Sequence, residues 1–115
     1  MHEVSLAGGI LRIVEQAAER ERFSRLLRLR LEAGSLAGVD VRALRFALEA
    51  LSAGTLLDGA RIDIDSPMGR AWCMDCAANV AIEQRGNACP ACGSYQLIPN
   101  GGTELRVVDM EVADT

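Results

Sequence analysis

Apolar and polar positions alternate with a period that changes several times along the chain, and these changes predict two helices and three strands. Residues 4–18 and 41–51 have apolar side chains at steps of three and four, the spacing of an amphipathic helix. Residues 25–32 alternate leucine with charged residues, which is typical of a half-buried strand with a charged outer face. Two further stretches, 61–65 and 103–112, predict a short strand and a C-terminal strand. The leucines of 25–32 that we expect to point inward are Leu27, Leu29 and Leu31.

Individual residue types suggest where the helices begin and where they are weak. Ser5 is placed to cap the first helix, and Asp40 stands where the N-cap of the second helix belongs. Gly8 and Gly9 lie within the first helical pattern. Each glycine costs a helix about 1 kcal/mol relative to alanine, so we expect the first turns to be weak.

The order of these elements predicts the fold class. Helix, strand, helix and strand are followed by a cysteine-rich segment and a last strand. We therefore expect an α+β fold in which a small three-stranded sheet carries two helices and a zinc-ribbon-like module is inserted before the last strand. The predicted domains are an α/β domain of residues 1–69 and 101–115 and a second domain of residues 70–100.

Composition and charge exclude several classes of protein. The formal net charge is −4 and the basic residues are 12 arginines without a lysine, which argues against a nucleic-acid partner. Five of these arginines lie between Arg20 and Arg30, and we interpret them as a solvated strand face rather than a phosphate site. No run approaches the roughly 18 apolar residues of a membrane helix, and no signal-peptide pattern opens the chain. We expect a cytoplasmic protein without a membrane partner.

The cysteines give the strongest chemical signal in the sequence. They form the pattern C-x2-C, twelve residues, C-x2-C, the spacing of a site in which four thiolates hold Zn²⁺ in a tetrahedron. Four thiolates leave no position for water or substrate, which favours a structural site over a catalytic one. Pro90 stiffens the second turn, and Gly93 permits the left-handed residue after it. The predicted zinc ligands are Cys73, Cys76, Cys89 and Cys92.

Only two long aliphatic residues, Val80 and Ile82, lie between the cysteine pairs. Metal, more than burial of apolar side chains, must therefore fold this segment. A rubredoxin-like iron site uses the same four ligands and stays open as an alternative at this point.

The single histidine stands at position 2, beside the chain's first amine. The Met1 amine, the His2 amide and the His2 imidazole form a series of nitrogen donors that suits Ni²⁺ or Cu²⁺ in a planar arrangement. The Glu3 amide or side chain is available for the fourth position. The chain offers no nucleophile–base pair apart from this histidine, so we expect a protein that is not an enzyme.

Taken together, three blocks of sequence resemble the HypA/HybF family of hydrogenase maturation nickel metallochaperones. The blocks are "MHE" before an amphipathic helix, "LEAGSLAGVDVRALRFALE", and "CxxC–x12–CPxCG" with the closing "GGTELRVVDMEV". The resemblance implies that Met1, His2 and Glu3 hold nickel as cargo and that the four cysteines hold structural zinc. It also implies a nickel-carrying maturation GTPase as partner and a [NiFe]-hydrogenase large-subunit precursor, or in some organisms urease, as recipient.

Two other functions stay open from the residues themselves. One is a zinc-ribbon adaptor that binds protein or nucleic acid without a nickel role, using Arg70, Trp72, Arg85 and Tyr95. The other is a rubredoxin-like electron carrier, which the red colour of the purified protein would reveal.

Overall fold

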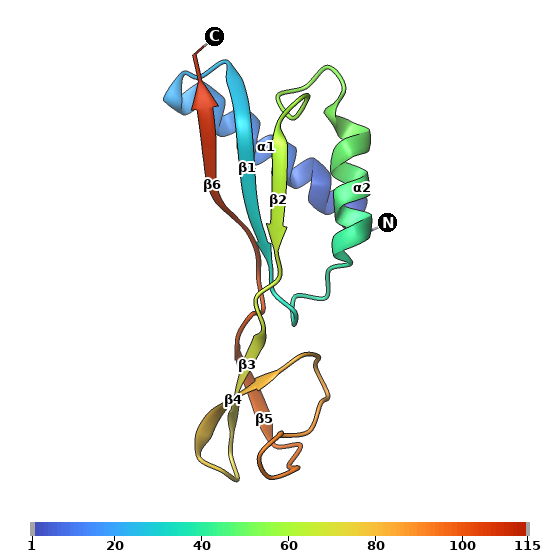
Figure 1. Cartoon of the computed structure of the whole chain (residues 1–115), viewed down its shortest axis with the longest axis vertical. Coiled ribbons are helices and arrows are strands. Elements are labelled where there is room, and N and C mark those ends of the chain that lie inside the picture. The colour runs from blue at the N-terminus through green and yellow to red at the C-terminus, as the bar shows by residue number, and fades with distance from the viewer. Residues whose placement is uncertain (1, 115) are drawn as a thin grey trace. The chain divides into compact units, whose positions relative to one another are not determined.

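The computed structural model describes residues 2–114, which form two helices and six strands (Figure 1). The strands belong to two three-stranded sheets, with the orders β2-β1-β6 and β4-β3-β5. The α+β class and the small three-stranded sheet with two helices are confirmed. In chain order the elements are α1 (His2–Glu21), β1 (Arg25–Ala33), α2 (Val41–Ser52), β2 (Arg61–Asp65), β3 (Gly69–Cys73), β4 (Ala78–Ile82), β5 (Leu97–Gly101) and β6 (Leu105–Ala113).

The chain divides into two compact units. The helical unit comprises Met1–Leu31, Asp40–Ile64 and Val107–Thr115, and the cysteine unit comprises Glu32–Val39 and Asp65–Arg106. The predicted division, residues 1–69 with 101–115 and residues 70–100, differs from these compact units, in which residues 32–39, 65–69 and 101–106 group with the cysteine segment. Among residues 2–114, no helix is long and apolar enough to cross a membrane.

In the helical unit, α1 and α2 pack together and α1 crosses one face of the sheet (Figure 1). Strands β1 and β6 run antiparallel, since Ser24 N–H at one end of β1 donates to the Ala113 carbonyl at the end of β6. Strand β2 follows β1 through α2, which is the crossover connection that parallel neighbours need. The core is aliphatic, as the composition indicates, and its largest fully buried side chains are Leu29, Leu31, Leu44, Leu48, Leu57 and Val14.

Of the two predicted helix N-caps, one is confirmed and one is wrong. Asp40 caps α2 as predicted, because its backbone is extended and its carboxylate accepts from Ala43 N–H at 3.1 Å. Helix α1, however, begins at His2, so Ser5 lies inside it and is not its cap. The helix also runs without a break through Gly8 and Gly9. Packing of its buried face against α2 outweighs their low helical propensity.

The leucine alternation of β1 is one residue out of phase at its start. Leu29 and Leu31 are fully buried as predicted, but Leu26 is buried in place of Leu27, which is 39% exposed. Two residues separate Leu26 from Leu29, so the period of two is broken there. The prediction of an inward Leu27 is therefore wrong.

The charged face of β1 carries ion pairs to both neighbouring strands. Arg28 Nε lies 2.6 Å from an Asp63 carboxylate oxygen on β2, and Arg28 Nη1 lies 3.3 Å from Glu111 on β6. Arg30 pairs with Asp109 on β6. The interpretation of these arginines as a solvated strand face is confirmed for Arg28 and Arg30, which contact carboxylates of the same sheet.

The cysteine unit has a core of its own, although a small one. Its antiparallel sheet buries Ala71 of β3 and Ile82 of β4, and both pack against Leu36. Val80 and Leu97 complete this cluster. Leu36 comes from the segment 32–39, which explains why that segment belongs to the cysteine unit rather than to the helical one. The sequence pattern gave no indication of this contact.

Three glycines allow separate segments of the cysteine unit to pass in direct backbone contact. A Cβ placed on Gly34 would overlap the carbonyl group of Gly102, and one placed on Gly69 would lie 2.6 Å from the Ile82 carbonyl oxygen. Gly102 itself has a φ of 68° and lies against the backbone of Gly69. Side chains are excluded at this crossing because those on Gly34 and Gly102 would meet main-chain atoms, which cannot turn away, and one on Gly69 would meet both the Ile82 main chain and the buried Leu36 side chain.

We predict that Gly34→Ala destabilises the cysteine unit by roughly 2 kcal/mol or more, because the added methyl group has no space beside Gly102. Gly8→Ala is the matched control, since no atom lies within 4 Å of its Cβ position, and it should stabilise α1 by about 1 kcal/mol. Denaturant unfolding of both variants measures the difference. Equal stability of the two variants would contradict the close crossing.

Candidate metal centres

The two C-x-x-C segments fold as two turns of the same kind. Ala77 N–H donates to the Cys73 carbonyl at 2.8 Å, and Gly93 N–H donates to the Cys89 carbonyl at 2.8 Å. The residue after each second cysteine has a positive φ, 53° at Ala77 and 78° at Gly93. The left-handed Gly93 is thus confirmed. Its counterpart Ala77 was missed, because alanine carries no sequence signal for this conformation.

Backbone hydrogen bonds hold the two turns in position. Cys73 ends β3, and the next residue, Met74, donates its N–H to the Gln96 carbonyl at 2.9 Å just before β5. In the second turn, Cys89 N–H donates to the Ser94 carbonyl at 2.7 Å. The pairing of β3 with β5 therefore brings the two turns together. The sequence pattern did not predict this pairing.

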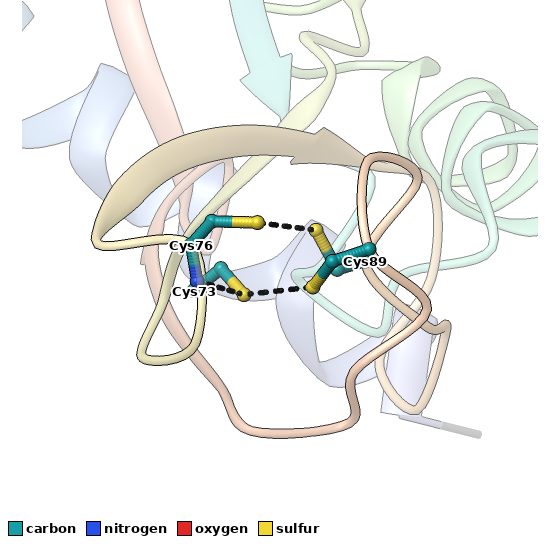
Figure 2. A group of neighbouring side chains, drawn as sticks. Cys73, Cys76 and Cys89 are labelled. Carbon is teal, nitrogen blue, oxygen red and sulfur yellow. Dashed lines mark hydrogen bonds between the residues drawn. The ribbon is translucent and has the colours of Figure 1, made fainter.

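The four sulfur atoms lie within 4.8 Å of one another, and Figure 2 shows the Cys76 and Cys89 side chains pointing toward the same centre. The Cys73 and Cys92 sulfurs are 3.6 Å apart, and the Cys76 and Cys89 sulfurs are 3.9 Å apart. A tetrahedron with Zn–S bonds of about 2.3 Å has edges of roughly 3.8 Å. The spacing of the donor atoms therefore fits a single tetrahedral thiolate-bound metal ion.

The electrostatics of the cluster explain why a cation belongs there. Hydrogen bonding with Cys92, loss of hydration and the sulfurs of Cys73 and Cys89 raise the pKa of Cys76 to about 12. The Ser94 amide and Cys76 lower the pKa of Cys92, but desolvation and the other two sulfurs outweigh them and raise it. Thiolates this close together repel one another, so these groups keep their protons unless a cation compensates the charge.

Cys89 is the exception within the cluster. Burial raises the pKa of its thiol, but hydrogen bonds from the backbone amides of Cys92 and Ala91, together with neighbouring sulfurs, lower it to about 7. The second turn therefore already stabilises one thiolate. It is the natural first ligand for an incoming metal ion, since the thiolate is the form that binds metal.

The cluster forms a closed site with one exposed side. Cys73 and Cys89 are buried, Cys76 is half-buried and Cys92 is exposed. Four sulfur donors complete a tetrahedron, so a bound ion has no open position for substrate. Within residues 2–114, these cysteines are the one group of three or more histidine, cysteine or acidic side chains close enough to share an ion.

The predicted nickel-binding residues belong to the helical unit. Met1 lies outside the described residues. His2 is exposed in the first turn of α1, where backbone N–H groups have no acceptor within the helix. The Glu3 carboxylate accepts from the backbone N–H of Asp40 at 3.2 Å, and this hydrogen bond is the main reason that the pKa of Glu3 is lowered. The start of α1 is thereby tied to the start of α2, a contact that the sequence did not indicate.

The fold and the site define a class: a small α+β protein whose cysteine unit carries a cluster of four thiols suited to hold one metal ion. A family model described as "Hydrogenase/urease nickel incorporation, metallochaperone, hypA" matches residues 1–112. The chain belongs to this HypA family, and the resemblance seen in the sequence is confirmed.

Named relatives and solved structures agree with this assignment. The chain is 64% identical over 114 residues to "Hydrogenase maturation factor HypA" of Polaromonas naphthalenivorans, covering 99% of both chains. It is 62% identical over 114 residues to the protein of the same name from Cupriavidus necator, covering 99% of this chain and 96% of that one. The solution structure of the Ni metallochaperone HypA from Helicobacter pylori superposes with a TM-score of 0.69 at 21% identity, covering 98% of each chain, which supports the fold.

We predict that adding Zn²⁺ to the metal-free protein near pH 8 releases one proton each from Cys76 and Cys92, whose raised pKa values keep them protonated there. Apparent zinc affinity should then rise by at least about a hundredfold per pH unit between pH 7.5 and 8.5, and fall on acidification. Proton release followed with an indicator in weak buffer is the measurement. Protein with alkylated cysteines is the control, and zinc binding without proton release would contradict the assignment.

Proposed function

We propose that this protein is a nickel carrier that binds Ni²⁺ at its N-terminal segment and delivers it during [NiFe]-hydrogenase maturation, with Zn²⁺ as a structural ion. The observation that carries the proposal is the position of the single histidine. His2 is exposed in the first turn of α1, in a chain that belongs to a nickel-incorporation family. The proposal requires a free amine on Met1, which intact-mass measurement can check.

The chemistry of the nickel site follows from the order of its donor atoms. The Met1 amine, the His2 amide nitrogen and the His2 imidazole close two chelate rings around one ion. Nickel can displace the amide proton, and the His2 amide gives up no helical hydrogen bond when it does so. The positive end of the helix dipole also favours the deprotonated amide.

The fourth position of the nickel plane is better assigned to a water molecule than to the Glu3 carboxylate. The carboxylate is hydrogen-bonded to Asp40 N–H, and binding nickel through it would cost that hydrogen bond. The Glu3 amide nitrogen cannot take this position, because a five-membered ring would join it to the His2 amide nitrogen, whereas the remaining position in the plane lies opposite that nitrogen. In this assignment the Glu3 side chain fixes the start of α1 while Met1 and His2 bind the metal.

The role assigned to zinc is structural. The sulfur spacing and the closed coordination sphere support zinc at Cys73, Cys76, Cys89 and Cys92. The apolar core of the cysteine unit is small, so metal binding should supply much of its folding free energy.

Family membership supports the partners that we propose. We assign a nickel-carrying maturation GTPase as the exchange partner and the hydrogenase large-subunit precursor as the recipient, with urease as a second possible recipient. Four cysteine thiols held close together, without disulfides, are consistent with action in the reducing cytoplasm.

We predict that one equivalent of Ni²⁺ gives the native protein a yellow, planar-type absorption band that is lost in His2→Ala. Binding should weaken at acid pH, because amine, amide and imidazole nitrogens must all lose or lack protons to bind the metal. A variant with one residue added before Met1 is the control, because it moves the amine away from His2. Equal nickel binding by all three proteins would instead favour the zinc-ribbon adaptor function.

A second prediction separates the two roles of Glu3. Glu3→Gln keeps an oxygen that can accept from Asp40 N–H and should retain the nickel absorption band with an affinity within about threefold of the native protein. Glu3→Ala keeps the backbone amide but loses the contact, and should bind nickel with the same band at about tenfold lower affinity. Nickel titration followed by absorption measures both. A changed band in Glu3→Gln would assign the carboxylate as a ligand.

A further inference from the structure

An apolar groove lies beside the nickel-binding segment, between the start of α1 and α2. It has a volume of about 300 Å³, and the first turn of α1 and α2 form its walls. Figure 1 shows the N-terminal end of α1 beside α2. All of its lining residues belong to the helical unit. They are Glu3, Val4, Ala43, Phe46, Ala47, Ala50 and Leu51.

The groove combines a projecting aromatic ring with a hollow. Phe46 is 74% exposed on α2, and Val4 on α1 is 51% exposed. The three alanines on α2 leave space next to the ring. The one charged residue of the lining, Glu3, has its carboxylate hydrogen-bonded to Asp40 N–H. The hollow therefore presents apolar surface and suits one large apolar side chain, such as leucine or phenylalanine.

The apolar pattern of α2 does not require an aromatic residue at this position. The inward face of the helix buries Leu44, Ala47 and Leu48, and Phe46 is not among these buried residues. An aromatic ring left in water gains nothing for the fold, whereas at an interface it contributes large contact area at low entropy cost.

The size of the patch decides between two kinds of occupant. A ring exposed to this degree offers roughly 150 Å², and a stable interface buries about 800 Å² on each partner. The groove is therefore too small to hold a permanent dimer of this chain. It matches a transient encounter, which is the kind of contact that transfer of a metal ion requires.

The position of the groove next to His2 indicates which kind of protein binds in it. Glu3 and Val4, which form part of its wall, directly follow His2. A protein seated in the groove is thus in contact with the segment that holds the nickel. On α2, Arg42 and Glu49 are exposed four residues before and three residues after Phe46, so they add one charge of each sign on the same helix face.

We propose that this groove is the docking site of the protein that exchanges nickel with the N-terminal segment. The partner inserts one large apolar side chain beside Phe46 and places carboxylate and basic groups against Arg42 and Glu49. This inference rests on the proposed function and adds to it the surface that brings donor and acceptor together.

The test compares Phe46→Ala with Ile13→Ala in the full-length, zinc-loaded protein. Ile13 is 47% exposed on α1 and is not part of the groove, so it controls for the loss of exposed apolar surface. The probe is the maturation GTPase from the same organism. Calorimetry gives the dissociation constant of the complex, absorption gives the nickel affinity of each variant, and stopped-flow mixing gives the nickel-transfer rate.

We expect Phe46→Ala to weaken the complex by about tenfold and to slow nickel transfer to a similar extent, with unchanged nickel affinity. Ile13→Ala should match the native protein in all three measurements. Unchanged docking of Phe46→Ala, or equal weakening by both substitutions, would overturn the proposal. A concentration-dependent dimer that Phe46→Ala abolishes would assign the groove to a second copy and overturn it too.

Failure of the proposed function is distinguishable from failure of this inference. If the native protein binds no nickel at its N-terminal segment, the nickel titration shows this without the GTPase. Docking is measured separately with nickel-free protein. A GTPase complex that depends on Phe46 in the absence of nickel binding would keep the docking site and reject the carrier role.

Discussion

The stability of the cysteine unit depends on how the repulsion among its four thiolates is compensated, because their sulfur atoms lie within 4.8 Å of one another. Two turns, fixed by their own hydrogen bonds and by the β3–β5 pair, bring the thiols together although their charged forms repel. The raised pKa values of Cys76 and Cys92 are the direct result. A divalent cation bound by the four thiolates would turn this repulsion into attraction. In the proposed structural role of zinc, the metal ion supplies the cohesion that the small apolar core of the unit does not.

The helical unit is stabilised differently. Its buried core is built mainly of aliphatic side chains, with Phe23 also buried. Its start is nevertheless constrained, because the Glu3 carboxylate joins the first turn of α1 to the N-cap of α2. A terminal chelate usually belongs to a flexible chain end, whose ordering on binding costs conformational entropy. For the proposed nickel site, holding Glu3 in place would reduce that cost.

Sequence reasoning succeeded where a local pattern has one physical cause, and it missed contacts between distant segments. The spacing of the cysteines, the Asp40 cap and the left-handed Gly93 follow from neighbouring residues alone. Leu36 in the core of the cysteine unit and Gly34 against Gly102 do not, because chain crossings leave no periodic signal. The prediction of a buried Leu27 also failed because of contacts between distant segments. Packing against the helices, not the alternation along β1, selects Leu26 as the buried residue.

In the proposed function, the nickel site and the zinc site use different donor atoms for a chemical reason. A thiolate cluster binds many divalent ions tightly, and the Irving–Williams order places copper, not nickel, first among the divalent ions for nitrogen donors. A nickel carrier must keep nickel out of the zinc site and zinc out of the nickel site. Soft sulfur in a rigid tetrahedron suits zinc, whereas nickel gains from planar nitrogen donors that include a deprotonated amide. Zinc has no preference for a plane, so geometry discriminates between the sites where affinity alone would not.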